Sequence, residues 1–509
     1  MSIEGYLCPK CGEEDMHRAG KTTNQGAVKQ NYRCWACKSR TTKPRKPDAE
    51  VEMRTSVPKS KRYIVTAAQN ATPLNDNVWN SLKQCAKHYD AELIVIPGRY
   101  KNPTSQWTEE NDSHEWWDAE VMPYLVKGTI NLGNMLVILG NVKIQWAAMN
   151  PLTSLESLTK DKSGIVGHSR LALKSIATPN HKHPKIMYTT GCVTQPNFTD
   201  SKQGAIASFN HSYGGLVVEV AADRFHVRQL VCMSNGSFCD LDKEFTPDGV
   251  RDAPRPMTLV MGDTHWVKMD ADVYKATFKS ILPALKPHYL IWHDLYDQHT
   301  RNHHTIDNFV SRFAKLGLDE DDVKVEVDTT LQGLVDHTPD DCLSVVVSSN
   351  HDRALQTWLL RSDFKKDIKN AKFYVDLTSK LFSHMEANDY KSIDPFVLYG
   401  RDFVGDKPNI KFLDPDESFM LCDVEFSMHG DKGANGSRGS CQGLSKISKS
   451  VIGHSHTASI VGGCWQVGTS TAQLEYSVGS PSSWSNTHCL QYYNGKRTLI
   501  TIIKGKWRL

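Results

Sequence analysis

The second half of the chain holds five short clusters of histidine, aspartate and asparagine, each directly after an apolar run. In chain order they are Asp263-Thr264-His265, His293-Asp294, Asn350-His351-Asp352, His429 and Gly453-His454-Ser455-His456. Hydrolysis of a phosphate ester needs an activated water and stabilised charge on the attacking and leaving oxygens. Two divalent ions about 3.5–4 Å apart supply both. The residue types therefore predict a two-metal hydrolytic site.

The spacing within the clusters suits metal binding. Asp263 and His265 can bind one ion from a strand end, and His454 and His456 lie two apart, so that in an extended segment both rings face the same side. Asp294 can bridge two ions as a lone carboxylate. Imidazole and carboxylate together suit manganese, iron or zinc better than magnesium. We expect manganese, with iron, zinc or magnesium as alternatives.

Taken in order, the clusters resemble the calcineurin-like metallophosphoesterase superfamily. The Asp-x-His start and the Gly-His-Ser-His end are similar to DNA-repair nuclease subunits of the SbcCD type, over Pro256 to Leu509. The resemblance implies that one metal is held by Asp263, His265 and His456. It implies that the second is held by Asn350, His429 and His454, and that Asp294 bridges the two.

The same resemblance implies roles for two more residues of the third cluster. His351 would act as a general acid toward the leaving oxygen, or contact the phosphate, and Asp352 would orient His351 by accepting a hydrogen bond. The chain departs from the family pattern at His293 and Ser349, where glycine is usual. Both larger residues are expected to crowd the site.

Basic residues follow two of the clusters. Arg353 comes directly after the third, and His299, Arg301, His303 and His304 follow the second. Arg301 and Arg353 could hold a substrate phosphate. The alternative is a solvated polar loop with no role in binding.

The elements that must position these residues alternate short apolar strands with helical patterns. In α/β folds the ligands lie on loops after the carboxyl ends of the strands. We therefore predict an α/β fold in which residues 254–509 form a metallophosphoesterase-type β-sandwich flanked by helices.

The N-terminal segment carries two CxxC pairs, Cys8/Cys11 and Cys34/Cys37. Their spacing is typical of a four-thiolate structural zinc site. We predict a zinc ribbon over residues 1–46 and a basic, mobile linker over 47–62. Aromatic and basic side chains crowd the second CxxC pair and could contact nucleic acid, although such ribbons also dock proteins: Tyr32, Arg33, Trp35, Lys38 and Arg40.

Residues 63–253 are predicted to form an α/β or α+β domain of unknown role. Gly167-His168-Ser169-Arg170 mimics the fifth cluster but lacks its second histidine, so we interpret it as coincidence. No internal repeat is apparent.

Composition adds few limits. The net charge of +3 gives no global basic field, and the 13 cysteines without a signal-peptide pattern suggest reduced thiols. No apolar run reaches the roughly 18–20 residues of a membrane span. A cytoplasmic location follows as the expectation, in the host cytoplasm for a phage-encoded protein.

We predict a metal-dependent DNase, with DNA as its partner, no membrane partner, and a homo-oligomer because related nucleases often form dimers. The layout of ribbon, unassigned domain and phosphoesterase resembles phage-encoded nucleases that degrade host DNA. One alternative is a phosphatase or nucleotide phosphodiesterase of the same superfamily, since one fold serves many substrates. The other is a non-enzymatic module that binds nucleic acid or protein.

Overall fold

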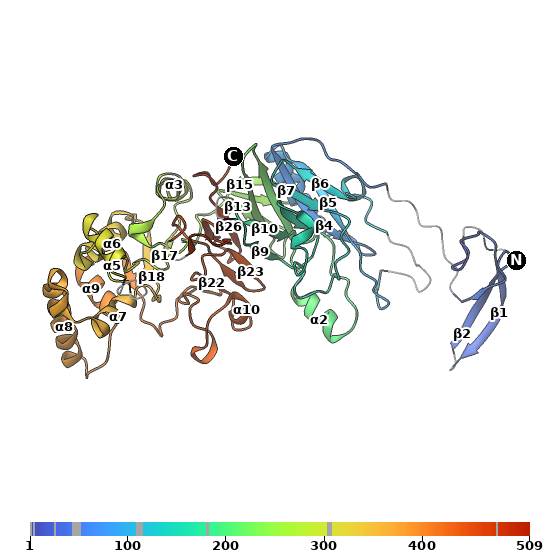
Figure 1. The fold of residues 1–509 in the computed structure, drawn as a ribbon. Coiled ribbons are helices and arrows are strands. Elements are labelled where there is room, and N and C mark those ends of the chain that lie inside the picture. Colours follow the sequence, from blue (N-terminus) through green and yellow to red (C-terminus); the bar gives the residue numbers. More distant parts are fainter. Residues whose placement is uncertain are drawn as a thin grey trace.

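The computed structural model describes residues 3, 6–24, 27–42, 52–107, 116–179, 183–302, 308–474 and 477–509. These residues form a mixed α/β structure with several sheets and helices, as predicted. Figure 1 shows a small N-terminal sheet apart from a larger body, in which most helices gather at the end far from that sheet.

The N-terminal sheet is antiparallel, with β1 (Met16–Asn24), β2 (Ala27–Cys34) and β3 (Arg40–Thr41) in that order. The first part of the predicted linker, 47–51, lies outside the described residues. The rest is not a free tether as predicted, because Arg54 donates to the carbonyl oxygens of Leu93 and Tyr124 and pairs with Glu92. These contacts fix the segment on the larger body.

The first half of the larger body begins with a βαβ unit. β4 (Arg62–Gln69), α1 (Asp76–His88) and β5 (Glu92–Gly98) form it, and the two strands pair in parallel. Asn75 begins α1 by accepting a hydrogen bond from the Val78 amide. Antiparallel strands β11 (Gly214–Val220) and β12 (Phe225–Val231) complete a four-stranded sheet of order β12-β11-β4-β5.

A ten-stranded sheet contains strands from both halves of the chain, in the order β20-β21-β22-β24-β23-β9-β10-β8-β7-β6. The first half supplies β6 (Thr129–Leu132), β7 (Leu136–Leu139), β8 (Ser163–Val166), β9 (Ala172–Ile176) and β10 (Lys185–Thr189). The second half supplies β20 (Met420–Leu421), β21 (Val424–Glu425), β22 (Ser450–Ile452), β23 (Ser459–Val461) and β24 (Cys464–Gln466).

A six-stranded sheet of order β19-β18-β17-β16-β25-β26 belongs to the second half alone. Its first four strands are parallel and its last two antiparallel. They are β16 (Thr258–Val260), β17 (Tyr289–Trp292), β18 (Leu343–Val346), β19 (Ile410–Phe412), β25 (Thr487–Gln491) and β26 (Arg497–Thr501).

Helices cover one face of the six-stranded sheet, and the ten-stranded sheet covers the other. Leu290 and Val346 pack in a core with helix residues such as Leu331, whereas Ile291 packs in a second core with Val451 of the facing sheet. The helices of the second half are α3 (Ala271–Ala276), α4 (Leu282–Leu285), α5 (Phe309–Gly317), α6 (Val323–Asp336), α7 (Ala354–Arg361), α8 (Ile368–Ala387), α9 (Pro395–Val404) and α10 (Cys441–Leu444).

The predicted boundary at 253/254 does not separate two independent domains. The antiparallel pairing of β9 with β23 makes one continuous sheet of strands from both sides of that boundary, and one hydrophobic core runs through both. The first half also contains α2 (Lys202–Phe209), which precedes β11. After β12 comes a small antiparallel sheet of β13 (Phe238–Asp240), β14 (Lys243–Thr246) and β15 (Gly249–Asp252).

Among the described residues, no helix combines the length and the apolar character needed to cross a membrane.

Candidate metal centre

All five clusters lie at one edge of the two facing sheets. The first three follow the carboxyl ends of β16, β17 and β18, which are parallel neighbours. The fourth and fifth follow β21 and β22, which are parallel neighbours in the other sheet. Strands from both sheets therefore bring residues that are far apart in the chain to one place.

The first group of side chains consists of Asp263, His265, Asp294 and His456. The Nε2 atoms of His265 and His456 are 3.1 Å apart, and His456 Nε2 is 3.4 Å from Asp263 Oδ2. His265 Nε2 is 3.7 Å from Asp294 Oδ2. The structure thus gathers the residues predicted for the first metal, together with the predicted bridging aspartate.

The second group shares Asp294 and adds Asn350, His429 and His454. His429 Nε2 is 3.2 Å from Asp294 Oδ1 and 3.0 Å from Asn350 Oδ1. His454 Nδ1 is also 3.0 Å from Asn350 Oδ1. All seven predicted ligands therefore converge, in two groups that meet at Asp294, while their role as metal ligands stays a prediction.

The backbone of the site is strained. His265, Asp294, His454 and His456 adopt positive φ angles of 41°, 43°, 76° and 56°. Such left-handed conformations are uncommon for residues other than glycine, and they concentrate at functional sites. Gly453 is required for packing, because a Cβ there would lie 2.1 Å from Asp263 Oδ1.

Burial gives the site unusual electrostatics. Burial raises the pKa of Asp263 well above its ordinary value, and the neighbouring Asp294 adds to this effect. Burial would also raise the pKa of Asp294, but His429 and His351 outweigh it and hold that pKa well below normal. Burial lowers the pKa of His429, but Asp294 reverses this and raises it to about 9. A bound cation would have to displace the His429 proton.

The donor set fits divalent cations. Both carboxylate oxygens of Asp263 and the Oδ2 of Asp294 are buried and make no hydrogen bond within the described part of the chain. A buried carboxylate oxygen that accepts no hydrogen bond is costly unless a cation compensates it. Imidazole, carboxylate and amide oxygen donors together suit Mn, Fe or Zn. The site can therefore hold two such ions that share Asp294.

His351 lies beside the first group but is oriented differently from the prediction. Its Nδ1 faces the Asp297 carbonyl oxygen at 3.3 Å and the Asp297 carboxylate at 3.6 Å. Asp352, predicted to orient His351, instead accepts a hydrogen bond from the Tyr296 amide at 2.9 Å. That role for Asp352 is wrong, because its side chain holds the neighbouring loop.

Asp297 is the residue that the sequence reasoning missed. Its Oδ1 is 2.8 Å from His265 Nδ1, so it contacts one predicted ligand and faces His351. Burial would raise the pKa of Asp297, but the His265 hydrogen bond and the charges of nearby histidines outweigh it and lower that pKa to about 2. The available signal was a second carboxylate three residues after Asp294. Trp484 was also missed, and its ring centroid lies 4.2 Å from that of His456.

The predicted substrate-binding arginines are already paired. Arg301 is buried and donates two hydrogen bonds to the Asp367 carboxylate, at 2.7 and 2.9 Å. Arg353 pairs with Asp431 and donates to Ser348 Oγ. His299 lies 2.9 Å from Glu320. The role of Arg301 and Arg353 in phosphate binding stays a prediction, and His303 and His304 lie outside the described residues.

The two departures from the family pattern are accommodated. His293 is fully buried, with its Nδ1 3.4 Å from His429 Nδ1. Ser349 Oγ accepts a hydrogen bond from the Asp352 amide at 3.1 Å, which closes the turn of the third cluster. His293 does crowd the site, and it contacts a predicted ligand.

The four cysteines of the ribbon also converge. Ligand atoms of Cys8, Cys11, Cys34 and Cys37 all lie within 4.8 Å of one another. The amides of Lys10 and Cys37 point at the Sγ atoms of Cys8 and Cys34, at 3.4 and 3.5 Å. The set is a possible zinc site of the predicted four-thiolate type.

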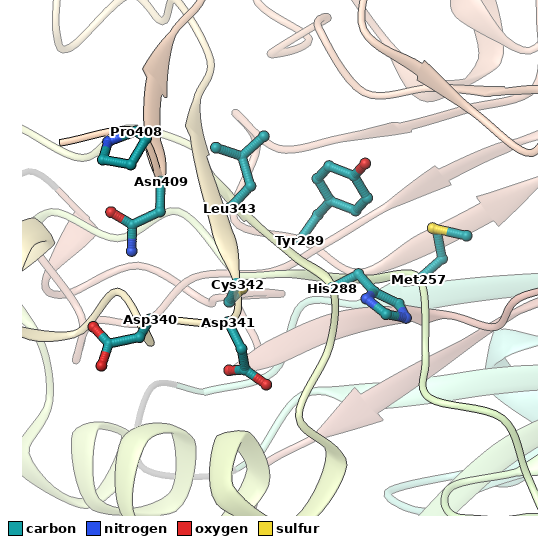
Figure 2. Close-up of a pocket in the computed structure, with 9 residues that line it drawn as sticks. All are labelled: Met257, His288, Tyr289, Asp340, Asp341, Cys342, Leu343, Pro408 and Asn409. Atoms are coloured by element: carbon teal, nitrogen blue, oxygen red, sulfur yellow. The ribbon is translucent and has the colours of Figure 1, made fainter. Parts of the chain in front are cut away.

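A hollow of the described surface lies elsewhere. Figure 2 shows it around the starts of β16, β17 and β18, with Met257, Tyr289 and Leu343 among its lining residues. Its volume is about 630 Å³. Because it opens at the amino ends of these strands, it is separate from the clusters at their carboxyl ends.

No protein-family model matches the chain. The chain is 32% identical over 467 residues to a protein named Protein A1 from Escherichia phage T5. The match covers 89% of this chain and 83% of that protein, and it supports a phage origin. The chain therefore belongs to the family of the phage T5 Protein A1.

Proposed function

We propose that the chain is a metal-dependent DNase that hydrolyses DNA phosphodiester bonds, with residues 254–509 as a calcineurin-like metallophosphoesterase. The observation that carries the proposal is the convergence of five distant clusters on one shared carboxylate, Asp294. Two ions about 3.5–4 Å apart need such a bridging ligand. The sandwich with helices on one outer face supports the same proposal.

The residues of the site have different roles in the proposed reaction. When bound, the two ions would activate a water and neutralise charge on the phosphate. Asp297 holds His265 in place, with its carboxylate 2.8 Å from Nδ1. His351 uses Nδ1 toward Asp297 and is partly exposed, which leaves Nε2 to donate a proton to the leaving oxygen or to contact the phosphate.

The ribbon supports DNA as the substrate. Trp35 is 58% exposed, and the Lys38 ammonium lies 5.9 Å from its ring centroid. Arg33 and Arg40 are exposed beside it. An exposed aromatic ring among cations can stack on bases and neutralise phosphates.

The test is cleavage of supercoiled plasmid, linear duplex and single-stranded DNA with added manganese. We expect cleavage by the wild-type chain and its loss in Asp294→Asn, because the bridging ligand is then uncharged. Asp389→Asn, a matched change at an exposed site, should cleave normally. Metal analysis should find zinc lost in Cys8→Ser and manganese lost in Asp294→Asn.

Two results would reject the proposal in favour of the alternatives. Activity confined to p-nitrophenyl esters or phosphopeptides would assign the chain to phosphatases or nucleotide phosphodiesterases. Failure of the wild-type chain to retain any transition metal beyond the ribbon zinc would favour a non-enzymatic binding module.

The similarity to a phage protein supports a phage origin. We propose that the nuclease is made in the host cell and directed at host DNA. The proposed homo-oligomer has a candidate surface on α5, where Phe309, Phe313 and Leu316 are 81%, 77% and 59% exposed. Apolar patches of this kind often mark protein interfaces. Sedimentation of Phe313→Glu should then show a smaller species than the wild type, and a monomeric wild type would refute this.

A further inference from the structure

The ten-stranded sheet has the same strand pattern from both ends. From one edge the order is β20-β21-β22-β24-β23, and from the other it is β6-β7-β8-β10-β9. The pairings match as well: the first pair is antiparallel, the next two are parallel and the last is antiparallel, on both sides. The middle of the sheet, between β9 and β23, is the point of symmetry.

The other two sheets repeat this correspondence. β17-β16-β25-β26 and β5-β4-β11-β12 each contain a parallel pair followed by two antiparallel pairings. The corresponding strands also occur in the same order along the chain. In the first half, residues 99–128 stand where the second half has 293–419, which contain β18, β19 and α5 to α9.

Corresponding strands meet one another where the halves join. β9 pairs with its counterpart β23, and β12 contacts its counterpart β26, where the Gln229 amide donates to Thr498 Oγ1. An interface in which each element meets its own equivalent is the signature of a two-fold axis. The halves are therefore arranged like the two subunits of a symmetric dimer.

Local contacts identify the position that matches the metal centre. Ser470 lies two residues after Gly468, and its amide donates to the Asp263 carbonyl oxygen. Val193 lies two residues after Gly191, and its amide donates to the Ala67 carbonyl oxygen. A Cβ on Gly453 would meet Asp263, and one on Gly167 would meet Ala67. Ala67 therefore stands where the second half has Asp263.

The other first-group positions follow from register and motif. In the second half, Val260 of β16 pairs with Ile291 of β17, and the same register three residues on puts Asp294 opposite Asp263. In the first half, Ile96 of β5 pairs with Ala67 of β4, so Ile96 corresponds to Asp294. Two residues on, Gln69 replaces His265. In Gly167-His168-Ser169-Arg170, the arginine replaces His456. Alanine, isoleucine, glutamine and arginine thus replace two aspartates and two histidines.

We infer that residues 62–231 are a second copy of the sandwich that has lost its metal ligands and serves as a built-in partner of the first. The motif at Gly167 is then a remnant of the fifth cluster and not a coincidence, and the chain does contain an internal repeat. Long insertions and replaced ligands hid it from the sequence pattern. The expectation of two metal ions per chain rests on the proposed function. The duplication itself rests on the strand pairings.

The built-in partner also braces the metal-binding loop. β9 pairs with β23, which begins three residues after His456. Beyond β9, Thr178 exchanges two backbone hydrogen bonds with Ser482, at 2.9 and 2.8 Å, and Trp484 of that segment contacts His456. The non-catalytic copy therefore supports both segments that flank His456.

The test compares the equivalent residues His454 and His168, each changed to glutamine. Manganese per chain is counted after dialysis, and anomalous diffraction from manganese-soaked crystals locates the ions. We expect two manganese ions at Asp294 and none at Ala67 in the wild type. His454→Gln should lose manganese, and His168→Gln should keep both ions.

Four manganese ions per chain, anomalous density beside Ala67, or an equal loss of metal in both variants would overturn the inference of a metal-free copy. If the wild type binds no manganese, the proposed function fails, but the duplication is still tested by the same crystals. Under a rotation close to a half-turn, the nine corresponding strands should superimpose, and failure to do so would refute the duplication.

The brace has a separate test. Leu173→Ala on β9 should weaken manganese retention by the folded protein, whereas Leu139→Ala on β7, buried in the same sheet but away from the loop, should not. Equal manganese affinities in two variants of similar melting temperature would contradict the bracing role.

Discussion

The two halves of the larger body carry different residues at the carboxyl ends of corresponding parallel strands. At the ends of β16 and β17, Asp263 and Asp294 are buried with unpaired oxygens and depend on neighbouring histidines. At the ends of β4 and β5, Ala67 and Ile96 fill the same places, and Gln69 donates to the Asn197 carbonyl at 2.7 Å. The comparison teaches that the strand framework sets positions, whereas the side chains at those positions decide whether a cation can be held.

The halves also differ in the segment that comes after their second strand. Only the second half continues into β18 and the helices, and with them the third cluster of Asn350, His351 and Asp352. In the proposed mechanism, the second ion and the proton donor both depend on that segment. A functional two-metal site in the first half would therefore need more than a few substitutions.

The strongest way to sharpen the comparison is to make the half with the proposed metal site resemble the other half. Asp263→Ala should lower DNA cleavage by at least about a hundredfold, because metal ions contribute several kcal/mol of transition-state stabilisation. In EDTA its melting temperature should rise, since a buried carboxylate that accepts no hydrogen bond is removed. Calorimetry with and without manganese checks this, and a lower melting temperature in EDTA would contradict it.

The reverse change should break the inactive half. Ala67→Asp puts a carboxylate at a position with 0% exposure beside Ile96 and should destabilise the fold by about 3 kcal/mol or more. Manganese should not rescue it, since Gln69, Ile96 and Arg170 stand where the second half has His265, Asp294 and His456. Chemical denaturation with and without manganese provides the measurement, with the exposed Ala222→Asp as control. Stabilisation by manganese would show that this half retains a working site.

A smaller effect is expected from the residue that holds His265 and faces His351. Asp297→Asn should lower cleavage by about 10–100-fold, the usual effect of losing a partner of a metal ligand. Manganese affinity should fall with it, because His265 loses its charged acceptor. Asp352→Asn is the matched control and should leave manganese affinity near wild type. If Asp352→Asn weakened manganese binding more than Asp297→Asn, the orientation role predicted for Asp352 would be restored.

The site was predictable because local patterns carry it. Each cluster follows an apolar run, and the runs before Asp263, Asp294 and Asn350 are indeed neighbouring parallel strands. Residue type and order then identify donors without any knowledge of long-range contacts. The convergence of the two CxxC pairs was predictable for the same reason.

Features that could not be predicted depend on contacts between distant residues. The pairing of Arg301 with Asp367 joins segments 66 residues apart, and no local pattern distinguishes that arginine from one free to bind phosphate. The β9–β23 ladder is non-local in the same way, so the boundary at 253/254 was placed before the first cluster-bearing strand and not where the sheet ends. The repeat was hidden because its framework is preserved in strand order and pairing, with few identical residues.

The ladder between β9 and β23 has one further consequence. In a dimer of separate subunits, such a contact follows mass action and is lost on dilution. Here both strands belong to one covalent chain, so each meets its counterpart at a fixed effective concentration. The segment that carries His456 is therefore supported even when few copies of the protein are present.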